Sequence, residues 1–117
     1  MASRITSQIA SGATVNDARF QVGDLSVDLE ARCVSLAGRE IHISPTEFQL
    51  LETLIGHAGA VVNYPYLINA IWNSQQVWHV AYLKLLVSSL RHKLEPDPAH
   101  PRYVITQRGV GYRMATE

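Results

Sequence analysis

The sequence predicts an α+β domain in which a small antiparallel sheet precedes three helices and a C-terminal β-hairpin. Three observations lead to this fold class. Apolar and polar residues alternate over residues 20–43, apolar residues recur at helical spacing within residues 45–94, and the alternation returns over residues 103–114. The chain has 117 residues, 47% of them hydrophobic and 17% charged, which suits one domain with a core of its own.

The first 19 residues are small and polar and show no sustained period. We expect residues 1–19 to be a flexible linker or tail, and residues 20–117 to be the folded domain. Such a linker suits the C-terminal part of a longer protein. No apolar run approaches the roughly 18 residues of a membrane span, so we expect no membrane association. The single cysteine, Cys33, excludes a disulfide framework within the chain and indicates a reduced, cytoplasmic setting, with Cys33 as an inert core or strand residue.

Residues 20–43 predict four short antiparallel strands. Three pairs of turn residues divide the stretch: Gly23-Asp24, Glu30-Ala31 and Ala37-Gly38. The alternating apolar residues between them are Phe20, Val22, Leu25, Val27, Leu29, Val34, Leu36, Ile41 and Ile43. Period-2 runs separated by turns are typical of a meander.

At Ser44 the period changes to that of a helix. Ser44 and Glu47 form a capping box, with Pro45 at the first helical position. The apolar residues that follow at helical spacing are Phe48, Leu51, Leu54 and Ile55. We expect a helix over residues 45–57, with Gly59 as its stop.

Two further helices and a hairpin follow. Asn63 is an N-cap candidate for a helix over residues 64–72, and a polar loop over residues 73–78 separates it from a helix over residues 79–94. Three prolines end that last helix: Pro96, Pro98 and Pro101. Residues 103–114 then predict two strands around a glycine-containing turn.

The helix over residues 79–94 has two contrasting sides. Its core stripe is Leu83, Val87, Leu90 and Leu94, with Leu86 on the flank. The opposite side carries Ala81, Leu85, Ser88, Ser89 and His92, with Tyr82 and Lys84 at its margins. Short and hydroxyl side chains without an acid suit entry into a DNA major groove, where an apolar residue can meet a thymine methyl. A plain surface helix, or one that binds a protein through Leu85, is the alternative.

Charge and the hairpin favour a polyanionic partner. The net charge is zero, but residues 1–77 hold four basic and seven acidic side chains, whereas residues 78–117 hold six basic and three acidic ones. Arg108 lies at the hairpin tip beside Gly109, where it can enter a minor groove or touch phosphate. Chance sorting of charges, and glycines that only serve the turn, remain alternatives. Two helices followed by a basic hairpin form a winged helix-turn-helix.

Four motifs carry a resemblance to a known family. They are I-S-P-T-E-F-Q-L-L at 43–51, A-I-W at 70–72, L-V-S-S-L-R-H-K-L-E-P-D-P at 86–98 and P-R-Y-V-I-T-Q-R-G-V-G-Y-R at 101–113. Through them the chain resembles the winged-helix effector domain of OmpR/PhoB-type response regulators over about residues 20–115. Within that family it resembles the KdpE-like regulators, in motifs that many members share.

The resemblance implies sequence-specific binding of double-stranded DNA in a two-component regulatory system that controls transcription. The helix over residues 79–94 would be the recognition helix in the major groove, and the hairpin over residues 103–114 would be the wing at the minor groove or backbone. Residues 1–19 would lead from an N-terminal receiver domain of a longer parent protein. The domain would be a monomer alone and a dimer on direct-repeat DNA. The loop that can contact RNA polymerase would comprise Ser74, Gln75, Gln76 and Val77.

The resemblance also implies roles for single residues of the wing and of the helix end. Arg108 matches the wing arginine that reaches the minor groove, and Thr106 matches a position that often touches the DNA backbone. Arg91 matches a cation near phosphate at the end of the helix. Trp72 matches a mostly buried tryptophan that can touch phosphate through its indole N–H.

Other positions of the recognition helix depart from the family pattern. Tyr82 stands where a threonine usually meets phosphate, and Leu85 stands where a small apolar residue contacts a thymine methyl. Relatives often carry cations at the positions of Ala81, Ser88 and Ser89, so we expect modest affinity from the isolated domain. The candidate DNA-binding residues are Tyr82, Lys84, Leu85, Ser88, Ser89, Arg91, His92, Thr106 and Arg108.

Enzymatic chemistry is not expected, and neither is a cofactor or metal. The five histidines, His42, His57, His79, His92 and His100, show no metal-ligand spacing, and the chain has no phosphate-binding glycine loop. The competing interpretation is a winged-helix module that binds RNA polymerase or the receiver domain and binds DNA only weakly. Binding to DNA would weaken steeply with salt, whereas a protein contact centred on Leu85 would not.

Overall fold

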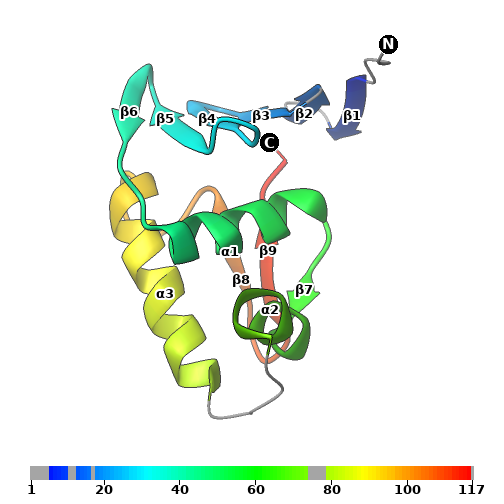
Figure 1. Ribbon diagram of the computed structural model, residues 1–117, viewed down its shortest axis with the longest axis vertical. Helices are drawn as coiled ribbons and strands as arrows, with labels where there is room; N and C mark the ends of the chain where they lie inside the picture. Colours follow the sequence, from blue (N-terminus) through cyan, green and yellow to red (C-terminus); the bar gives the residue numbers. More distant parts are fainter. Residues whose placement is uncertain (1–5, 11–12, 17, 74–78, 117) are drawn as a thin grey trace.

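The computed structural model describes residues 6–10, 13–16, 18–73 and 79–116. Three helices lie between two sheets that differ in size (Figure 1). The larger sheet covers one side of α1 (Pro45–Gly56), and α2 (Tyr64–Trp72), α3 (His79–Leu94) and the smaller sheet lie on the other side. The apolar core fills the space where these elements meet. The predicted α+β class, with three helices and a C-terminal hairpin, is confirmed.

The four predicted strands are present in the larger sheet. They are β3 (Arg19–Val22), β4 (Leu25–Asp28), β5 (Cys33–Leu36) and β6 (Arg39–Ile41), and each pairs antiparallel with the next. Phe20 lies opposite Val27, and Val27 lies opposite Val34. All three side chains are at most 1% exposed, so alternate residues of the meander face the core.

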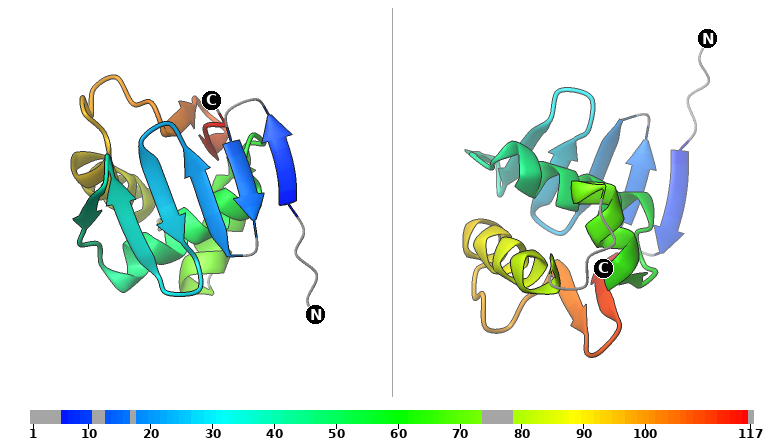
Figure 2. Two further views of the ribbon diagram at one scale, coloured as in Figure 1. Left: turned by 90° about the horizontal axis from the view of Figure 1, so that it is seen from above. Right: turned by 60° about the horizontal axis from the view of Figure 1, so that its bottom comes forward.

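Two additional strands extend this sheet. The pairs β1 (Thr6–Ala10) with β2 (Ala13–Asn16), and β2 with β3, are antiparallel, so the sheet has the order β1-β2-β3-β4-β5-β6 (Figure 2, left). The structure here differs from the expected flexible tail. The edge of β3 that does not pair with β4 has backbone groups available for hydrogen bonds with the preceding residues. The β-branched residues Thr14 and Val15 favour a strand there. The division of the chain between residues 19 and 20 stays a prediction.

The first helix begins as the capping box predicts. The Ser44 hydroxyl accepts a hydrogen bond from the Glu47 backbone N–H at 3.1 Å, and the Ser44 N–H donates to the Glu47 carboxylate at 2.7 Å. The helix ends at Gly56, one residue before the predicted end. Its buried apolar residues are Phe48, Leu50, Leu51, Leu54 and Ile55.

The other two helices have the predicted bounds. The Asn63 side chain accepts from the Tyr66 N–H at 2.9 Å and so caps the start of α2. The helix ends at Trp72, and Asn73 after it caps the end in the left-handed conformation. In α3 the predicted core stripe of Leu83, Val87, Leu90 and Leu94 is confirmed, with each side chain at most 1% exposed. The expectation for Cys33 is right about the strand and wrong about the core, because the side chain is exposed at the start of β5.

The C-terminal hairpin belongs to a small three-stranded sheet. Strand β9 (Gly111–Met114) lies between β7 (Val62–Asn63) and β8 (Val104–Gln107), and all the pairs are antiparallel. Strand β7 was not predicted, because two residues give no readable period. Gly111 lies opposite Asn63, and a Cβ built on Gly111 would be 1.9 Å from the Val62 carbonyl oxygen. The contact between β7 and β9 therefore requires a glycine at this position.

Candidate nucleic-acid interface

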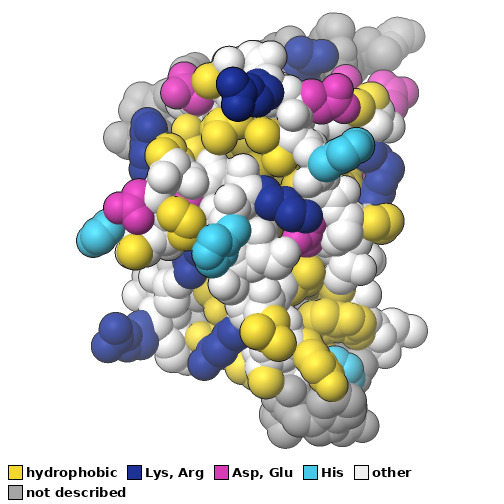
Figure 3. All heavy atoms as spheres, turned by 90° about the vertical axis from the view of Figure 1, so that its left-hand side faces the viewer, with side chains coloured by type: hydrophobic (Ala, Val, Ile, Leu, Met, Phe, Trp, Pro, Cys, Tyr) yellow, Lys and Arg dark blue, Asp and Glu magenta, His cyan; other side chains and the backbone are white. Residues whose placement is uncertain are grey.

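One long side of α3 faces away from the core. Leu85 is 67% exposed and Tyr82 is 53% exposed, and Lys84, Ser88 and His92 are also exposed. Figure 3 looks onto this side of the molecule. In its lower third, where α3 begins, the described surface shows Lys, Arg and hydrophobic side chains and no Asp or Glu. The contrast predicted for the two sides of the helix is present in the structure.

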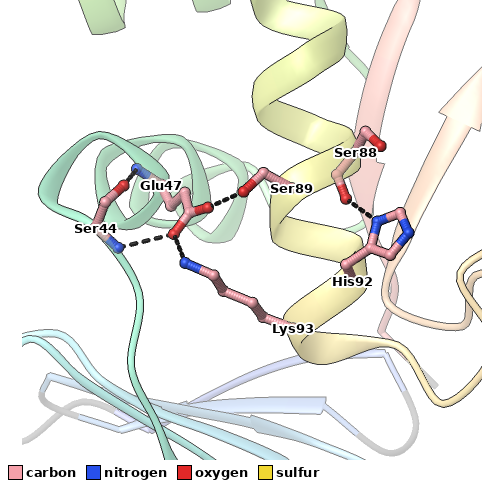
Figure 4. Close-up of polar contacts among 6 residues, drawn as sticks. All are labelled: Ser44, Glu47, Ser88, Ser89, His92 and Lys93. Carbon is pink, nitrogen blue, oxygen red and sulfur yellow. Dashed lines mark hydrogen bonds and ion pairs between the residues drawn. The ribbon is translucent and has the colours of Figure 1, made fainter.

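Ser88 and His92 form a pair on this exposed side. The His92 Nδ1 lies 2.8 Å from the Ser88 carbonyl oxygen, which can only accept, so Nδ1 carries the proton. The ring nitrogen Nε2 and the Ser88 hydroxyl project away from the core (Figure 4). Both are polar groups that can meet a base edge or a phosphate.

An acid lies beyond the C-terminal end of α3. Asp97 lines a surface groove of about 450 Å³ together with Ser88, Arg91 and His92. The Asp97 carboxylate pairs with the His100 ring at 3.0 Å. The hydrogen bond from His100, followed by one from the Ala99 backbone, lowers the pKa of Asp97. The surface without acids therefore covers the helix and ends at the loop after it.

Ser89 lies on a different side of the helix from Ser88. Its hydroxyl donates to the Glu47 carboxylate of α1, and the Lys93 ammonium donates to the same carboxylate at 2.6 Å (Figure 4). Glu47 is only 3% exposed. Burial alone would raise the pKa of Glu47, but the hydrogen bonds from Lys93, Ser89 and the Ser44 backbone outweigh it and lower the pKa. Ser89 thus joins two helices, a role that the sequence did not predict, and its DNA contact stays a prediction.

Arg91 and Thr106 bond to each other. The Arg91 Nη2 donates to the Thr106 hydroxyl at 2.6 Å and to the Val104 carbonyl oxygen at 2.7 Å, and Nε donates to the same carbonyl at 3.1 Å. Burial lowers the pKa of the Arg91 guanidinium, which nevertheless stays charged. The two residues expected to touch the DNA backbone therefore connect α3 to β8.

Glu95 was missed by the sequence reasoning. Its carboxylate is 6% exposed and accepts from the backbone N–H groups of Arg102 at 2.7 Å, Tyr103 at 3.0 Å and Val104 at 2.9 Å. It thereby fixes the start of β8 to the end of α3. A carboxylate whose partners are backbone amides gives no motif, because any residue type supplies an amide.

The hairpin tip is a tight turn with a cation on it. The Val110 N–H donates to the Gln107 carbonyl oxygen at 3.0 Å, and Gly109 has φ of +78°. Arg108 is exposed in this turn. The turn between β8 and β9 and the first turn of α3 lie at the same end of the molecule (Figures 1 and 2). The structure therefore brings together the two surfaces that the sequence assigns to one partner.

Aromatic side chains border the start of α3. The Trp72 and His79 rings stack with their centroids 5.3 Å apart, and Trp72 is half-buried, as expected for a mostly core residue. Together with Tyr82, Leu85 and Leu86 they line a surface groove of about 500 Å³. Ser74, Gln75, Gln76 and Val77, the residues expected to contact RNA polymerase, lie outside the described residues.

Two other kinds of site were sought in the described part of the chain. There, no three His, Cys, Asp or Glu side chains are grouped so that they could hold a metal ion. Among the described helices, none has both the length and the hydrophobicity needed to cross a membrane.

Comparisons with known proteins give a consistent result. Residues 38–114 match the family model described as "Transcriptional regulatory protein, C terminal". The KDP operon transcriptional regulatory protein KdpE of Escherichia coli K12 is 40% identical over 110 residues, which are 94% of this chain and 49% of that protein. The sensory transduction protein RegX3 of Mycolicibacterium smegmatis is 35% identical over 102 residues, 87% of this chain and 45% of that protein. The chain thus spans about half the length of these relatives.

Solved structures show the same fold. The response regulator DrrB of Thermotoga maritima, described as an OmpR/PhoB homolog, superimposes with a TM-score of 0.76 at 33% identity, over 84% of this chain and 44% of that one. The RstA DNA-binding domain of Klebsiella pneumoniae, solved in complex with the RstA box, gives 0.78 at 26% identity, over 85% of this chain and 98% of that one.

Proposed function

Because this chain belongs to the OmpR/PhoB-type family of C-terminal domains of transcriptional regulatory proteins, we propose that it is the DNA-binding part of a two-component response regulator. It binds double-stranded DNA in a sequence-specific way and so controls transcription. KdpE is named as a transcriptional regulatory protein and RegX3 as a sensory transduction protein, and the RstA DNA-binding domain was solved in complex with the RstA box.

One observation carries the proposal: the exposed, acid-free side of α3 and the arginine-bearing turn lie at one end of the molecule. A duplex placed there receives α3 in its major groove. The turn between β8 and β9 then reaches the minor groove or the backbone. This is the arrangement of a helix-turn-helix with a wing.

The proposed contacts follow from exposure and chemistry. Leu85 meets a thymine methyl, and Ser88 and His92 offer polar groups to bases or phosphate. Lys84 and the Tyr82 hydroxyl reach phosphates at the margins of the helix, and Arg108 enters the minor groove. The remaining candidates, Ser89, Arg91 and Thr106, also bond to other elements of the domain, Ser89 to α1 and the other two to each other between α3 and β8.

Few free cations remain on this surface, which limits the affinity of a single domain. Each phosphate contact contributes about 0.9 to the salt slope of binding, so two or three contacts predict a modest slope. We propose that the domain is a monomer alone, and that pairs form on direct-repeat DNA when an N-terminal receiver domain joins them. The receiver would occupy part of the half of the relatives that this chain does not span. The setting would be the cytoplasm.

A protein contact is the second candidate function. A surface groove is lined mainly by hydrophobic and aromatic side chains, those of Trp72, His79, Tyr82, Leu85 and Leu86. Two of them, Trp72 and His79, flank in the sequence the residues expected to contact RNA polymerase. Leu85 is the most exposed of the large hydrophobic side chains that the structure describes. A module that binds RNA polymerase or the receiver domain through this groove would bind DNA only weakly.

A selection experiment tests the proposal. The purified chain is incubated with a pool of random duplexes, the bound fraction is amplified and sequenced, and its affinity is measured at rising salt. We expect an enriched motif and an affinity that falls as salt rises, with the modest slope of two or three phosphate contacts. No enrichment, or an affinity for duplexes that salt leaves unchanged, would contradict DNA binding and leave the protein contact as the function.

A further inference from the structure

We propose that Arg91 is a positioning residue, which holds the wing at a fixed distance and angle from the recognition helix. The inference rests on the proposed function, since it concerns how α3 and the wing engage one duplex. It gives a second role to a cation that the family resemblance places beside phosphate.

Three hydrogen bonds join Arg91 to β8. Nε and Nη2 both reach the Val104 carbonyl oxygen, at 3.1 and 2.7 Å, and Nη2 also reaches the Thr106 hydroxyl at 2.6 Å. The guanidinium also lies 5.7 Å from the centre of the Tyr112 ring on β9. A planar guanidinium can make these three bonds together because its nitrogens are held in a fixed arrangement, which the single ammonium of a lysine cannot reproduce.

Glu95 completes the hold on the same strand. It lies four residues after Arg91 and therefore on the same side of α3. Its carboxylate accepts the N–H groups of residues 102–104, whereas Arg91 donates to groups of Val104 and Thr106. An anion thus holds the beginning of β8 and a cation holds its middle. Because β8 pairs with β9 along its length, these two contacts fix the direction of the whole hairpin relative to α3.

The tip of the wing depends on the second of these points. Thr106 precedes Arg108 by two residues, so the Arg91–Thr106 bond lies close to the turn. On its other side the hairpin is held through β9 by β7, a strand of only two residues. Loss of the arginine fork would let the outer part of β8 move. The Arg108 side chain would then no longer be presented to the minor groove in register with α3.

The decisive experiment is a double-mutant cycle between positions 91 and 108 in the full chain, with a duplex that the unaltered chain selects from a random pool. In the unaltered background we expect Arg108→Ala to weaken binding about tenfold. Arg91→Lys keeps the positive charge but loses the planar guanidinium, so it should itself weaken DNA binding. When Arg108→Ala is added to Arg91→Lys, the affinity should fall by less than about threefold. If Arg91 only contacts phosphate and does not position the wing, lysine should largely substitute and Arg108→Ala should give the same penalty in both backgrounds.

Controls keep the outcomes distinct. Lys84→Ala, on the exposed side of α3, should give the same penalty in both backgrounds, because it does not depend on the wing. If Arg91→Lys fails to fold, Thr106→Val replaces it, since that change leaves Arg91 bonded to Val104 and removes only the bond nearest the tip. Failure of the unaltered chain to bind any duplex overturns the proposed function. Binding with equal Arg108 penalties in all backgrounds overturns only the role of Arg91.

Discussion

The hydroxyl of Ser89 in α3 donates a hydrogen bond to the carboxylate of Glu47 in α1. The neighbouring Ser88 lies on the other side of the helix, beside His92 (Figure 4). Two adjacent serines of the recognition helix therefore serve different partners. One holds the helix to the body of the domain, and the other is available to a ligand.

This difference predicts opposite phenotypes for two matched substitutions. Ser89→Ala should lower the free energy of unfolding by about 1.5 kcal/mol, because it removes a hydrogen bond to a charged group, and should leave the affinity for the selected duplex within twofold. Ser88→Ala should change stability by less than about 0.5 kcal/mol and weaken DNA binding about threefold or more. Urea unfolding and binding titrations measure the two quantities. The reverse pattern would show that the sides of α3 are misassigned.

The Glu47 carboxylate should make stability depend on pH. Its pKa is lowered in the folded chain, so its contribution is present above the unfolded pKa of about 4.3 and is lost as pH falls through the lower folded value. Near pH 7, Glu47→Gln should cost about 1–3 kcal/mol of unfolding free energy. This difference from the unaltered chain should shrink below about pH 4. Glu40→Gln, at an exposed position, is the control. If Glu47→Gln lowered the free energy of unfolding by the same amount in acid as near pH 7, the pKa of Glu47 would not be lowered in the folded chain.

The two sides of α3 should also differ in stability. Leu90 is fully buried, so Leu90→Ala should lower the free energy of unfolding by about 2–5 kcal/mol. Leu85 is 67% exposed, so Leu85→Ala should change the free energy of unfolding by less than about 0.5 kcal/mol. The same substitution should weaken DNA binding. Chemical denaturation of both variants is the measurement. A loss of less than about 1 kcal/mol for Leu90→Ala would mean that the core stripe is wrong.

The two glycines of the wing should respond differently to alanine. At Gly111 a Cβ would collide with the backbone of β7, so Gly111→Ala should lower the free energy of unfolding by about 3 kcal/mol or more. At Gly109 a Cβ meets nothing within 4 Å, and only the positive φ opposes the change, which predicts a loss of about 1–2 kcal/mol. Equal losses at the two positions would contradict the close approach of β7 and β9.

Local patterns predicted the elements of this fold well. The capping box at Ser44, the period change after it and the apolar stripe of α3 depend on residues close together in the chain, and the structure confirms all three. The exposed side of α3 followed directly, because it is the complement of the stripe. Strands β1, β2 and β7 were not predicted, since they are short and form by pairing with an edge that already exists.

Contacts between distant residues account for what the sequence did not predict. Ser89 and Glu47 are 42 residues apart, and Arg91 and Thr106 are 15 residues apart. A helical wheel places a side chain on a face, but it does not say which other element covers the edge of that face. Ser89, Arg91 and Thr106, all candidate DNA-binding residues, therefore proved to bond to side chains of other elements.

The most direct test of the central claim is an amide NMR titration of the ¹⁵N-labelled chain with the selected duplex. If α3 and the wing together face the DNA, the largest shift changes will lie in the exposed positions of α3, such as Leu85 and Ser88, and in the turn at Arg108 and Gly109. The outward residues of the larger sheet, such as Ser35 and Glu40, should move little. Shift changes concentrated on that sheet, with α3 and the turn unaffected, would contradict the account.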